Sequence, residues 1–213
     1  MLPKICAHAQ PRPTCQLAHD YMSSPPPTKK IHLIRHAEAE HNVAWKLYGD
    51  VIWNDPHYTN PVLTDEGNRQ AHALKRFQEL YEVDKIFVSP SQRTLETAAI
   101  LYDIGPIHGD DRLLEYGPGR IVNRRDPHHL LADEWPTLDL SGVSSAAVPT
   151  DTEETDEVFE GRLKSIIDQI INDDRLSSVA FVTHHDAIHR IWNLYSSAPW
   201  PFIKNGQYLT LEL

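Results

Sequence analysis

Apolar and polar positions follow two periods along this chain, and the periods alternate. Short apolar runs typical of buried strands lie at 31–34, 85–88 and 179–182. A possible third strand lies within 107–115, and residues 208–213 alternate as an edge strand does. Helical spacing of apolar residues predicts helices at 62–81, 92–102, 153–172 and 186–195. Strands that alternate with helices indicate βαβ units. The sequence therefore predicts an α/β fold, a three-layer α/β/α sandwich around a mostly parallel sheet.

Two segments depart from this alternation. Residues 1–29 are rich in Pro, Ser and Thr and have little periodicity, so we expect a flexible Pro-rich tail before a single domain over 30–213. Residues 116–150 also lack a clear period, and we expect a long loop with at most short helices. Long loops in compact domains often carry function, which makes the second segment a candidate for substrate selection.

Composition and charge argue against several classes of protein. The net charge of −10 disfavours general binding to nucleic acid or an anionic membrane, because both would repel the chain. The two cysteines, Cys6 and Cys15, lie in the tail, which excludes a disulfide framework for the remainder. There is no apolar run of about 18 residues and no signal-peptide pattern near the start. We expect a soluble cytoplasmic protein, with the nucleus left open.

Cationic and imidazole side chains follow three of the predicted strands. Arg35 and His36 end the first strand, Arg93 closely follows the second, and His184 follows the strand at 179–182. Ligands of open parallel sheets bind outside the carboxyl ends of the strands, so these side chains should meet at one edge. Two guanidinium groups in an acidic protein favour a bound anion, and their planar forks of donors suit a phosphoryl group.

The histidines point to chemistry as well as binding. A neutral imidazole can attack phosphorus and form a phosphohistidine, which divides one difficult step into two. Flanking arginines and a second histidine would stabilise the charge of the transition state. Glu115, near the end of the predicted third strand, is a candidate acid for the departing oxygen, because a nearby dianion would raise its proton affinity.

Four segments of the chain carry recognisable motifs. Residues 35–42 (RHAEAEHN) are similar to R-H-G-E-S-x-x-N, and residues 63–71 (LTDEGNRQA) to L-T-x-x-G-x-x-Q-A. Residues 89–98 (SPSQRTLETA) are similar to S-P-x-x-R-x-x-x-T-A, and residues 182–184 to a late strand ending in His. These motifs and their order resemble those of the histidine phosphatase superfamily, the phosphoglycerate-mutase-like family, and the resemblance spans residues 31–193.

The resemblance implies a catalytic domain over 30–213 and a role for each matching position. His36 would be the phosphorylated nucleophile, and Glu115 would be the acid and base. Arg35, Arg93 and His184 would form the phosphate pocket, with Asn42 assisting. The family's phosphatase chemistry needs no metal or organic cofactor. The implied activity is a phosphomonoester hydrolase acting on a small phosphorylated metabolite.

Two residues depart from the family's pattern. Ala37 stands where Gly is frequent, and its methyl group is tolerated only if the backbone φ is negative. His185 stands where Gly commonly follows the late histidine, and it either contacts the substrate or faces solvent.

Three alternatives remain open. The sequence from His185 to His189 is H-x-x-x-H, whose two imidazoles could share a helix face and bind zinc. A mutase would use the same residues, but this chain is shorter than the family's dedicated phosphoglycerate mutases, which favours hydrolysis. A phospho-ligand-binding protein without catalysis would need the arginines but not His36.

Two segments beside the predicted site are the candidate selectors of substrate. The aromatic and histidine residues of 43–60 are Trp45, Tyr48, Trp53, His57 and Tyr58. The basic residues of 116–150 are Arg120, Arg124, Arg125, His128 and His129. The aromatic residues of the first set pack on an apolar or ring-bearing group of the substrate, or Trp45, Tyr48 and Trp53 simply belong to the core. Arg124 and Arg125 either contact a second anion or face solvent. The sequence does not specify the ester, the pathway or the oligomeric state.

Overall fold

The computed structural model describes residues 28–103, 106–146 and 153–213. Most of the predicted tail, residues 1–27, lies outside the described residues. The last residue assigned to the tail, Lys29, belongs to the folded part: its backbone exchanges two 2.9 Å hydrogen bonds with Leu213. Its Nζ also donates to the carbonyls of Asp173 and Leu176 at 2.7 and 2.9 Å.

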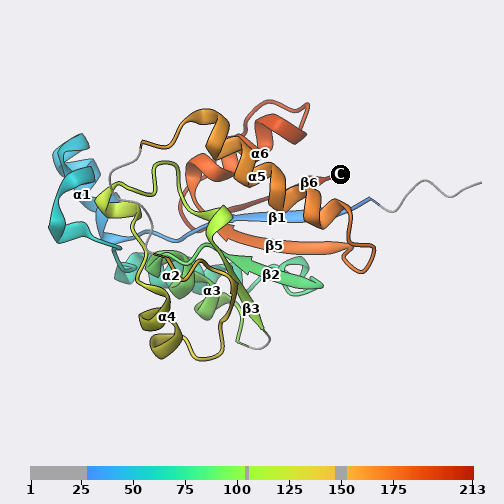
Figure 1. The fold of residues 1–213 in the computed structure, drawn as a ribbon, viewed down its shortest axis with the longest axis horizontal. Coiled ribbons are helices and arrows are strands. Elements are labelled where there is room, and N and C mark those ends of the chain that lie inside the picture. Colours follow the sequence, from blue (N-terminus) through green and yellow to red (C-terminus); the bar gives the residue numbers. More distant parts are fainter. Residues whose placement is uncertain (1–27, 104–105, 147–152) are drawn as a thin grey trace, which may run out of the picture.

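A six-stranded sheet forms the centre of the molecule (Figure 1). Its order is β4-β3-β2-β5-β1-β6. The strands are β1 (Lys30–Arg35), β2 (Lys85–Val88), β3 (Ile107–Asp110), β4 (Asp139–Gly142), β5 (Ser178–Thr183) and β6 (Tyr208–Glu212). All neighbours pair in parallel except β6, which is antiparallel to β1 at the edge. The predicted mostly parallel sheet is confirmed.

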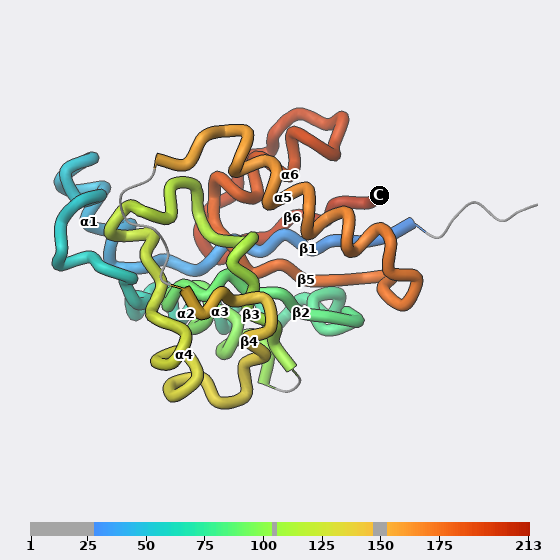
Figure 2. The backbone as a smooth tube through the Cα atoms, viewed as in Figure 1, coloured from blue at the N-terminus to red at the C-terminus, as the bar shows by residue number. Residues whose placement is uncertain are grey.

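Helices cover both faces of the sheet, as Figures 1 and 2 show. They are α1 (Glu40–Tyr48), α2 (Asp65–Leu74), α3 (Gln92–Leu101), α4 (His128–Glu134), α5 (Asp156–Ile171) and α6 (His185–Tyr195). Ile31 and Leu33 of β1 point into one buried cluster with α5 and α6, while Ile34 points into a second cluster with α2 and α3. This alternation is the period of a strand buried on both faces, so the three-layer sandwich is confirmed.

The helix predicted over 62–81 is shorter than expected. Thr64 caps it as its spacing indicated, with Oγ1 accepting from the N–H of Gly67 at 3.0 Å. The helix ends at Leu74, and a separate 3-10 turn covers Gln78–Leu80. Phe77 between them is extended, which lets Leu80 become fully buried while Phe77 packs on Tyr208. Tertiary packing therefore overrides the helical period in this segment.

Three further elements differ from the predictions. Residues 116–150 contain a strand, β4, in addition to the short helix α4, so the prediction of a loop without strands was wrong. The sequence of β4, Asp-Leu-Ser-Gly, is too short and polar to show a strand period. Helix α1 was not predicted. Strand β3 ends at Asp110, so Glu115 lies beyond it, after a 3-10 turn at Asp111–Leu113.

Candidate active site

The carboxyl ends of the parallel strands bring five of the six predicted residues together in the lining of one cavity of about 360 Å³. Its lining includes Arg35, His36, Asn42, Arg93 and Glu115. The His184 ring, which follows β5, lies 5.3 Å from the His36 ring between centroids. The volume lies near the lower end of the roughly 300–1,000 Å³ typical of small-molecule sites. The cavity therefore has the size for a small ligand beside two imidazoles.

One nitrogen of the His36 ring is fixed as a donor. Its Nδ1 lies 2.7 Å from the carbonyl oxygen of Ala37, and a carbonyl can only accept, so Nδ1 carries the proton. Nε2 then has a free lone pair in the neutral ring. Burial, followed by the positive charge of Arg93, keeps the pKa of His36 well below its usual value. The ring is therefore neutral near pH 7, which is the state a nucleophile requires.

His184 is held from its other side. Its Nε2 lies 2.8 Å from the Ser89 hydroxyl, while Nδ1 is buried without a hydrogen-bond partner among the described residues. Burial, and then the charge of Arg93, lower the pKa of His184 well below its usual value. A buried polar nitrogen without a partner is costly, so a ligand atom that reached Nδ1 would relieve this cost.

Arg93 is a buried cation and Arg35 a partly buried one, and neither has an anionic partner among the described residues. Arg93 is 1% exposed and donates to the carbonyl of Val122 and to Asn123 Oδ1, at 2.8 and 3.1 Å. Arg35 donates to the carbonyl of Ile203 at 2.9 Å. Within the described residues neither guanidinium forms an ion pair. Burial lowers the pKa of Arg93 to about 10, and burial also lowers the pKa of Arg35. A bound anion would relieve this cost.

The pKa of Glu115 is shifted upwards, whereas the pKa values of the histidines and arginines are shifted downwards. Burial, and then the negative charge of Asp186, raise the pKa of its carboxyl group. The carboxyl is held by the backbone N–H groups of Tyr116 and Asp186, at 2.9 and 3.3 Å. The site thus contains an acid that keeps its proton to higher pH than an ordinary glutamate does.

Arg162 of α5 supports the segment that carries Glu115. Its guanidinium donates to the carbonyls of Arg112, Leu114 and Glu115 at 2.7, 2.6 and 3.0 Å. The charge is balanced by Glu154, whose carboxylate lies 2.7 Å from Arg162 Nε. The predictions from sequence did not include Arg162, because it lies mid-helix and gives no signal of its carbonyl partners.

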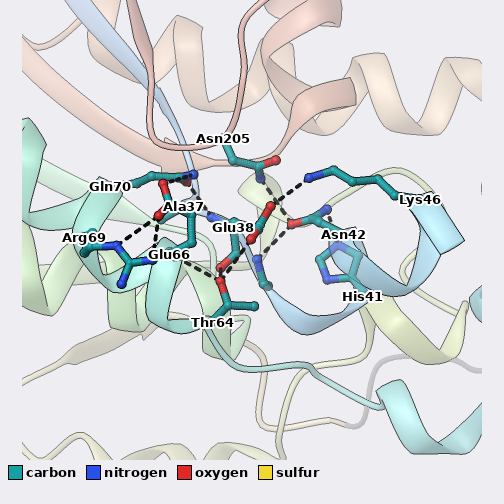
Figure 3. Close-up of polar contacts among 12 residues, drawn as sticks. Ala37, Glu38, His41, Asn42, Lys46, Thr64, Glu66, Arg69, Gln70 and Asn205 are labelled. Atoms are coloured by element: carbon teal, nitrogen blue, oxygen red, sulfur yellow. Dashed lines mark hydrogen bonds and ion pairs between the residues drawn. The ribbon is translucent and has the colours of Figure 1, made fainter.

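A chain of hydrogen bonds fixes a third imidazole, His41, that sequence reasoning also missed. Asn42 Oδ1 accepts from the N–H of Ala39 and from Asn205 at 2.9 and 3.2 Å, which turns Nδ2 towards His41 Nε2 at 3.0 Å (Figure 3). Nε2 must accept, so the proton of neutral His41 is on Nδ1. That nitrogen is buried without a partner among the described residues, and His41 lines the cavity.

The second and third motifs hold the loop that follows His36. Figure 3 shows Glu38 between Thr64 and Gln70 of the second motif. The N–H of Glu38 donates to Gln70 Oε1 at 2.9 Å, and its carbonyl accepts from the N–H of Thr64 at 3.0 Å. The N–H of Ala37 donates to Thr97 Oγ1 of the third motif at 3.1 Å. The hydrogen bonds of these polar residues therefore fix the backbone next to His36.

The two departures from the family's pattern have different consequences. Ala37 is fully buried and is not among the described non-glycine residues with positive φ, so its methyl group causes no backbone strain. His185 lines the cavity, and its Nδ1 lies 2.9 Å from Asp186 Oδ1. Its ring stacks on His189 at 6.2 Å, so the two histidines share a helix face. Across the described ranges, however, no group of three or more His, Cys, Asp or Glu could hold a metal ion.

The candidate selector residues divide into two groups. Trp45, Trp53 and Arg120 line the cavity. The remaining candidates do not line it, and these are Tyr48, His57, Tyr58, Arg124, Arg125, His128 and His129. The interpretation of Arg125 as a partner for a second anion was wrong, because its side chain is 1% exposed and paired with Asp111 at 2.7 Å. The core interpretation of Trp45 and Tyr48 was also wrong, since they are 48% and 64% exposed.

Comparisons with known proteins agree with the fold and the motifs. The sequence profile of the histidine phosphatase superfamily (branch 1) matches residues 31–211. A 2,3-bisphosphoglycerate-dependent phosphoglycerate mutase of Thermoplasma acidophilum is 30% identical over 159 residues, which cover 73% of this chain and 70% of that protein.

Two solved structures are similar in fold. A phosphoglycerate mutase of Bacillus anthracis superposes with a TM-score of 0.60 at 18% identity, covering 88% of this chain and 89% of the other. The α-ribazole phosphatase of Shigella flexneri gives 0.58 at 22% identity, covering 85% and 89%. Within the described residues, no helix is long and apolar enough to cross a membrane. With the family profile matched over most of its length, the chain belongs to the histidine phosphatase superfamily.

Proposed function

We propose that this protein is a phosphomonoester hydrolase that acts on a small phosphorylated molecule through a phosphohistidine at His36. One observation carries the proposal: a neutral, buried His36 with a free Nε2 lines a cavity together with two guanidinium groups, and neither guanidinium has an anionic partner in the described part of the chain. The guanidinium groups would bind a phosphate dianion, and the imidazole of His36 would be the nucleophile beside it.

In the first step, Nε2 of His36 attacks phosphorus while the ester P–O bond breaks. Arg35, Arg93 and His184 Nδ1 donate to the phosphoryl oxygens, where charge accumulates in the transition state. The Nδ1–H of His41 is a further donor for the same oxygens. Asn42 also sets the tautomer of His41, because its amide oxygen accepts from Ala39 and Asn205 and one N–H of its amide donates to His41 Nε2.

Glu115 completes both steps as acid and then base. Its protonated carboxyl gives a proton to the departing alkoxide, which leaves as the alcohol. The resulting carboxylate takes a proton from water as that water attacks phosphorus. The N–P bond then breaks, which releases inorganic phosphate, regenerates neutral His36 and leaves Glu115 protonated for the next cycle.

Mutase activity is the second candidate, because the relative from Thermoplasma acidophilum is named as a phosphoglycerate mutase. A mutase must keep its phosphoenzyme away from water. Here two residues of the cavity lining, Trp45 and Phe202, are 48% and 61% exposed, and the described segments include no cover over them. Access of water to the intermediate favours hydrolysis.

The test is release of inorganic phosphate from a panel of small phosphomonoesters by the wild-type protein and by His36→Ala. We expect turnover by the wild type and loss of turnover in His36→Ala, with His57→Ala, an exposed histidine outside the cavity, as the matched control. Retained turnover in folded His36→Ala would contradict the mechanism. Interconversion of phosphoglycerates faster than phosphate release would identify a mutase instead.

A further inference from the structure

Three large aromatic side chains line the cavity together with its charged groups. Trp45 on α1, Trp53 on the following 3-10 turn and Phe202 in the loop after α6 all belong to the lining. We call these three residues the aromatic rim. Trp45 and Phe202 are substantially exposed, at 48% and 61%. Large apolar side chains left exposed around a binding cavity are informative, because folding alone does not require them there.

The two tryptophans of the rim are held by one carboxylate. Asp50 Oδ1 accepts from the indole N–H of Trp45 at 2.9 Å and from that of Trp53 at 3.2 Å. Both polar atoms of the indoles are therefore satisfied within the protein. What remains for a ligand is ring surface, already oriented, so binding to it costs less side-chain entropy.

The third residue of the rim is held by the backbone. Phe202 has φ of 25°, a conformation that a non-glycine residue adopts at a cost. The next residue, Ile203, is buried and its carbonyl accepts from Arg35 Nη1 at 2.9 Å. The Phe202 ring lies 5.8 Å from the ring of His185. The strained residue is thus anchored next to a member of the phosphate pocket.

Charge at the mouth disfavours a second anionic group. Asp50 lies behind the two indoles, and Asp186 belongs to the lining. Arg120 is the cation among the described lining residues outside the phosphate pocket, and its guanidinium lies 5.8 Å from the centre of the Tyr116 ring. A polyanionic substrate would meet the carboxylate of Asp186 in the lining together with this one arginine.

We propose that the alcohol part of the substrate is aromatic, with its ring on the aromatic rim while the phosphoryl group contacts Arg35, Arg93 and His36. The inference rests on the proposed hydrolase function and specifies its substrate class. Contact between aromatic rings is more favourable than the burial of their surface alone. The rim should therefore bind an aromatic ester more tightly than an aliphatic ester of similar chemistry.

The experiment compares kcat/KM for benzyl phosphate and propyl phosphate, which both release an alkoxide and so place the same demand on the general acid. We expect the wild type to prefer benzyl phosphate by about tenfold or more. Trp53→Ala and Trp45→Ala should each reduce this preference. Asp50→Ala should reduce it without removing a ring, and Asp50→Asn should restore it, because an amide oxygen can still accept from both indoles. Tyr48→Ala is the matched control, an exposed aromatic residue of α1 outside the cavity.

Binding of benzylphosphonate and propylphosphonate, measured by calorimetry, separates the two proposals. If both esters are hydrolysed equally well and both phosphonates bind equally, the aromatic specificity is wrong and the hydrolase function stands. If neither ester is hydrolysed but benzylphosphonate binds more tightly, the hydrolase function fails and the aromatic specificity stands. Preference for a phosphorylated carboxylic acid that is lost in Arg120→Ala would also overturn the aromatic proposal.

Discussion

His36 and Glu115 are shifted in opposite directions by the same buried surroundings. Burial favours the uncharged form of each, so the pKa of His36 falls well below 6.5 and the pKa of Glu115 rises above 4.5. The reaction needs His36 unprotonated and Glu115 protonated. Activity should therefore increase with pH as His36 loses its proton and decrease as Glu115 loses its own. A single environment thus prepares both a nucleophile and an acid.

Glu115→Gln tests the acid. The variant cannot donate the proton, so kcat/KM for benzyl phosphate should fall by about 10²–10⁴ and the alkaline decrease of the pH profile should disappear. The kcat/KM for 4-nitrophenyl phosphate, which reports only the first step, should fall much less, because its leaving group departs without a proton. Steady-state rates of both esters from pH 4 to 9 provide the measurement. An equal loss with both esters would show that Glu115 acts in some way other than protonation.

At the scale of elements, the contact between α2 and the loop after β1 positions the site. The start of α2 lies so close to this loop that a Cβ on Gly67 would sit 2.0 Å from the carbonyl oxygen of Glu38. Neither backbone can move without shifting the residues next to His36. The glycine of the second motif is thus required by a close approach of two backbones.

Gly67→Ala should therefore impair both stability and activity. We expect the free energy of unfolding to fall by at least about 1–3 kcal/mol, as in overpacked cores, together with a lower kcat. Denaturant unfolding and initial rates measure the two effects. Gly161→Ala is the control, because it lies inside α5 with nothing within 4 Å of the added methyl. This control should gain about 0.5–1 kcal/mol from helix propensity. Equal stability of the two variants would contradict the packing argument.

The sequence was informative where a strand is buried or a motif is local. The apolar runs of β1, β2 and β5 predicted the central sheet, and the residues after each of them reach one cavity. The sequence was uninformative for β4, whose pairing depends on a strand distant in the chain. It was also uninformative for α1, whose apolar residues show little helical spacing. His41 was missed because its value as a donor depends on the orientation of Asn42, which Asn205 helps to set.

For the whole molecule, the proposed phosphate pocket should be a source of instability that a bound anion removes. Burial lowers the pKa of both Arg35 and Arg93, and neither guanidinium forms an ion pair among the described residues. A dianion binds only the folded state, so it stabilises that state by mass action.

Inorganic phosphate should therefore raise Tm in a concentration-dependent way. At about 100 times Kd the gain is about 2.7 kcal/mol, which for a chain of this size is a shift of roughly 5–10 °C. Arg35→Met and Arg93→Met should each lose most of this shift, while chloride at equal ionic strength should have little effect on any of the proteins. The same shift in both variants and the wild type would place the bound anion elsewhere.

The most direct test of the account is to trap the covalent intermediate. The wild-type protein and Glu115→Gln are mixed with 4-nitrophenyl phosphate, quenched within milliseconds in alkali to preserve a phosphohistidine, and digested for mass spectrometry. The account predicts one phosphoryl group on His36, accumulating further in Glu115→Gln because the base for its hydrolysis is absent. An unmodified His36 during turnover, or a phosphoryl group on another residue, would contradict it.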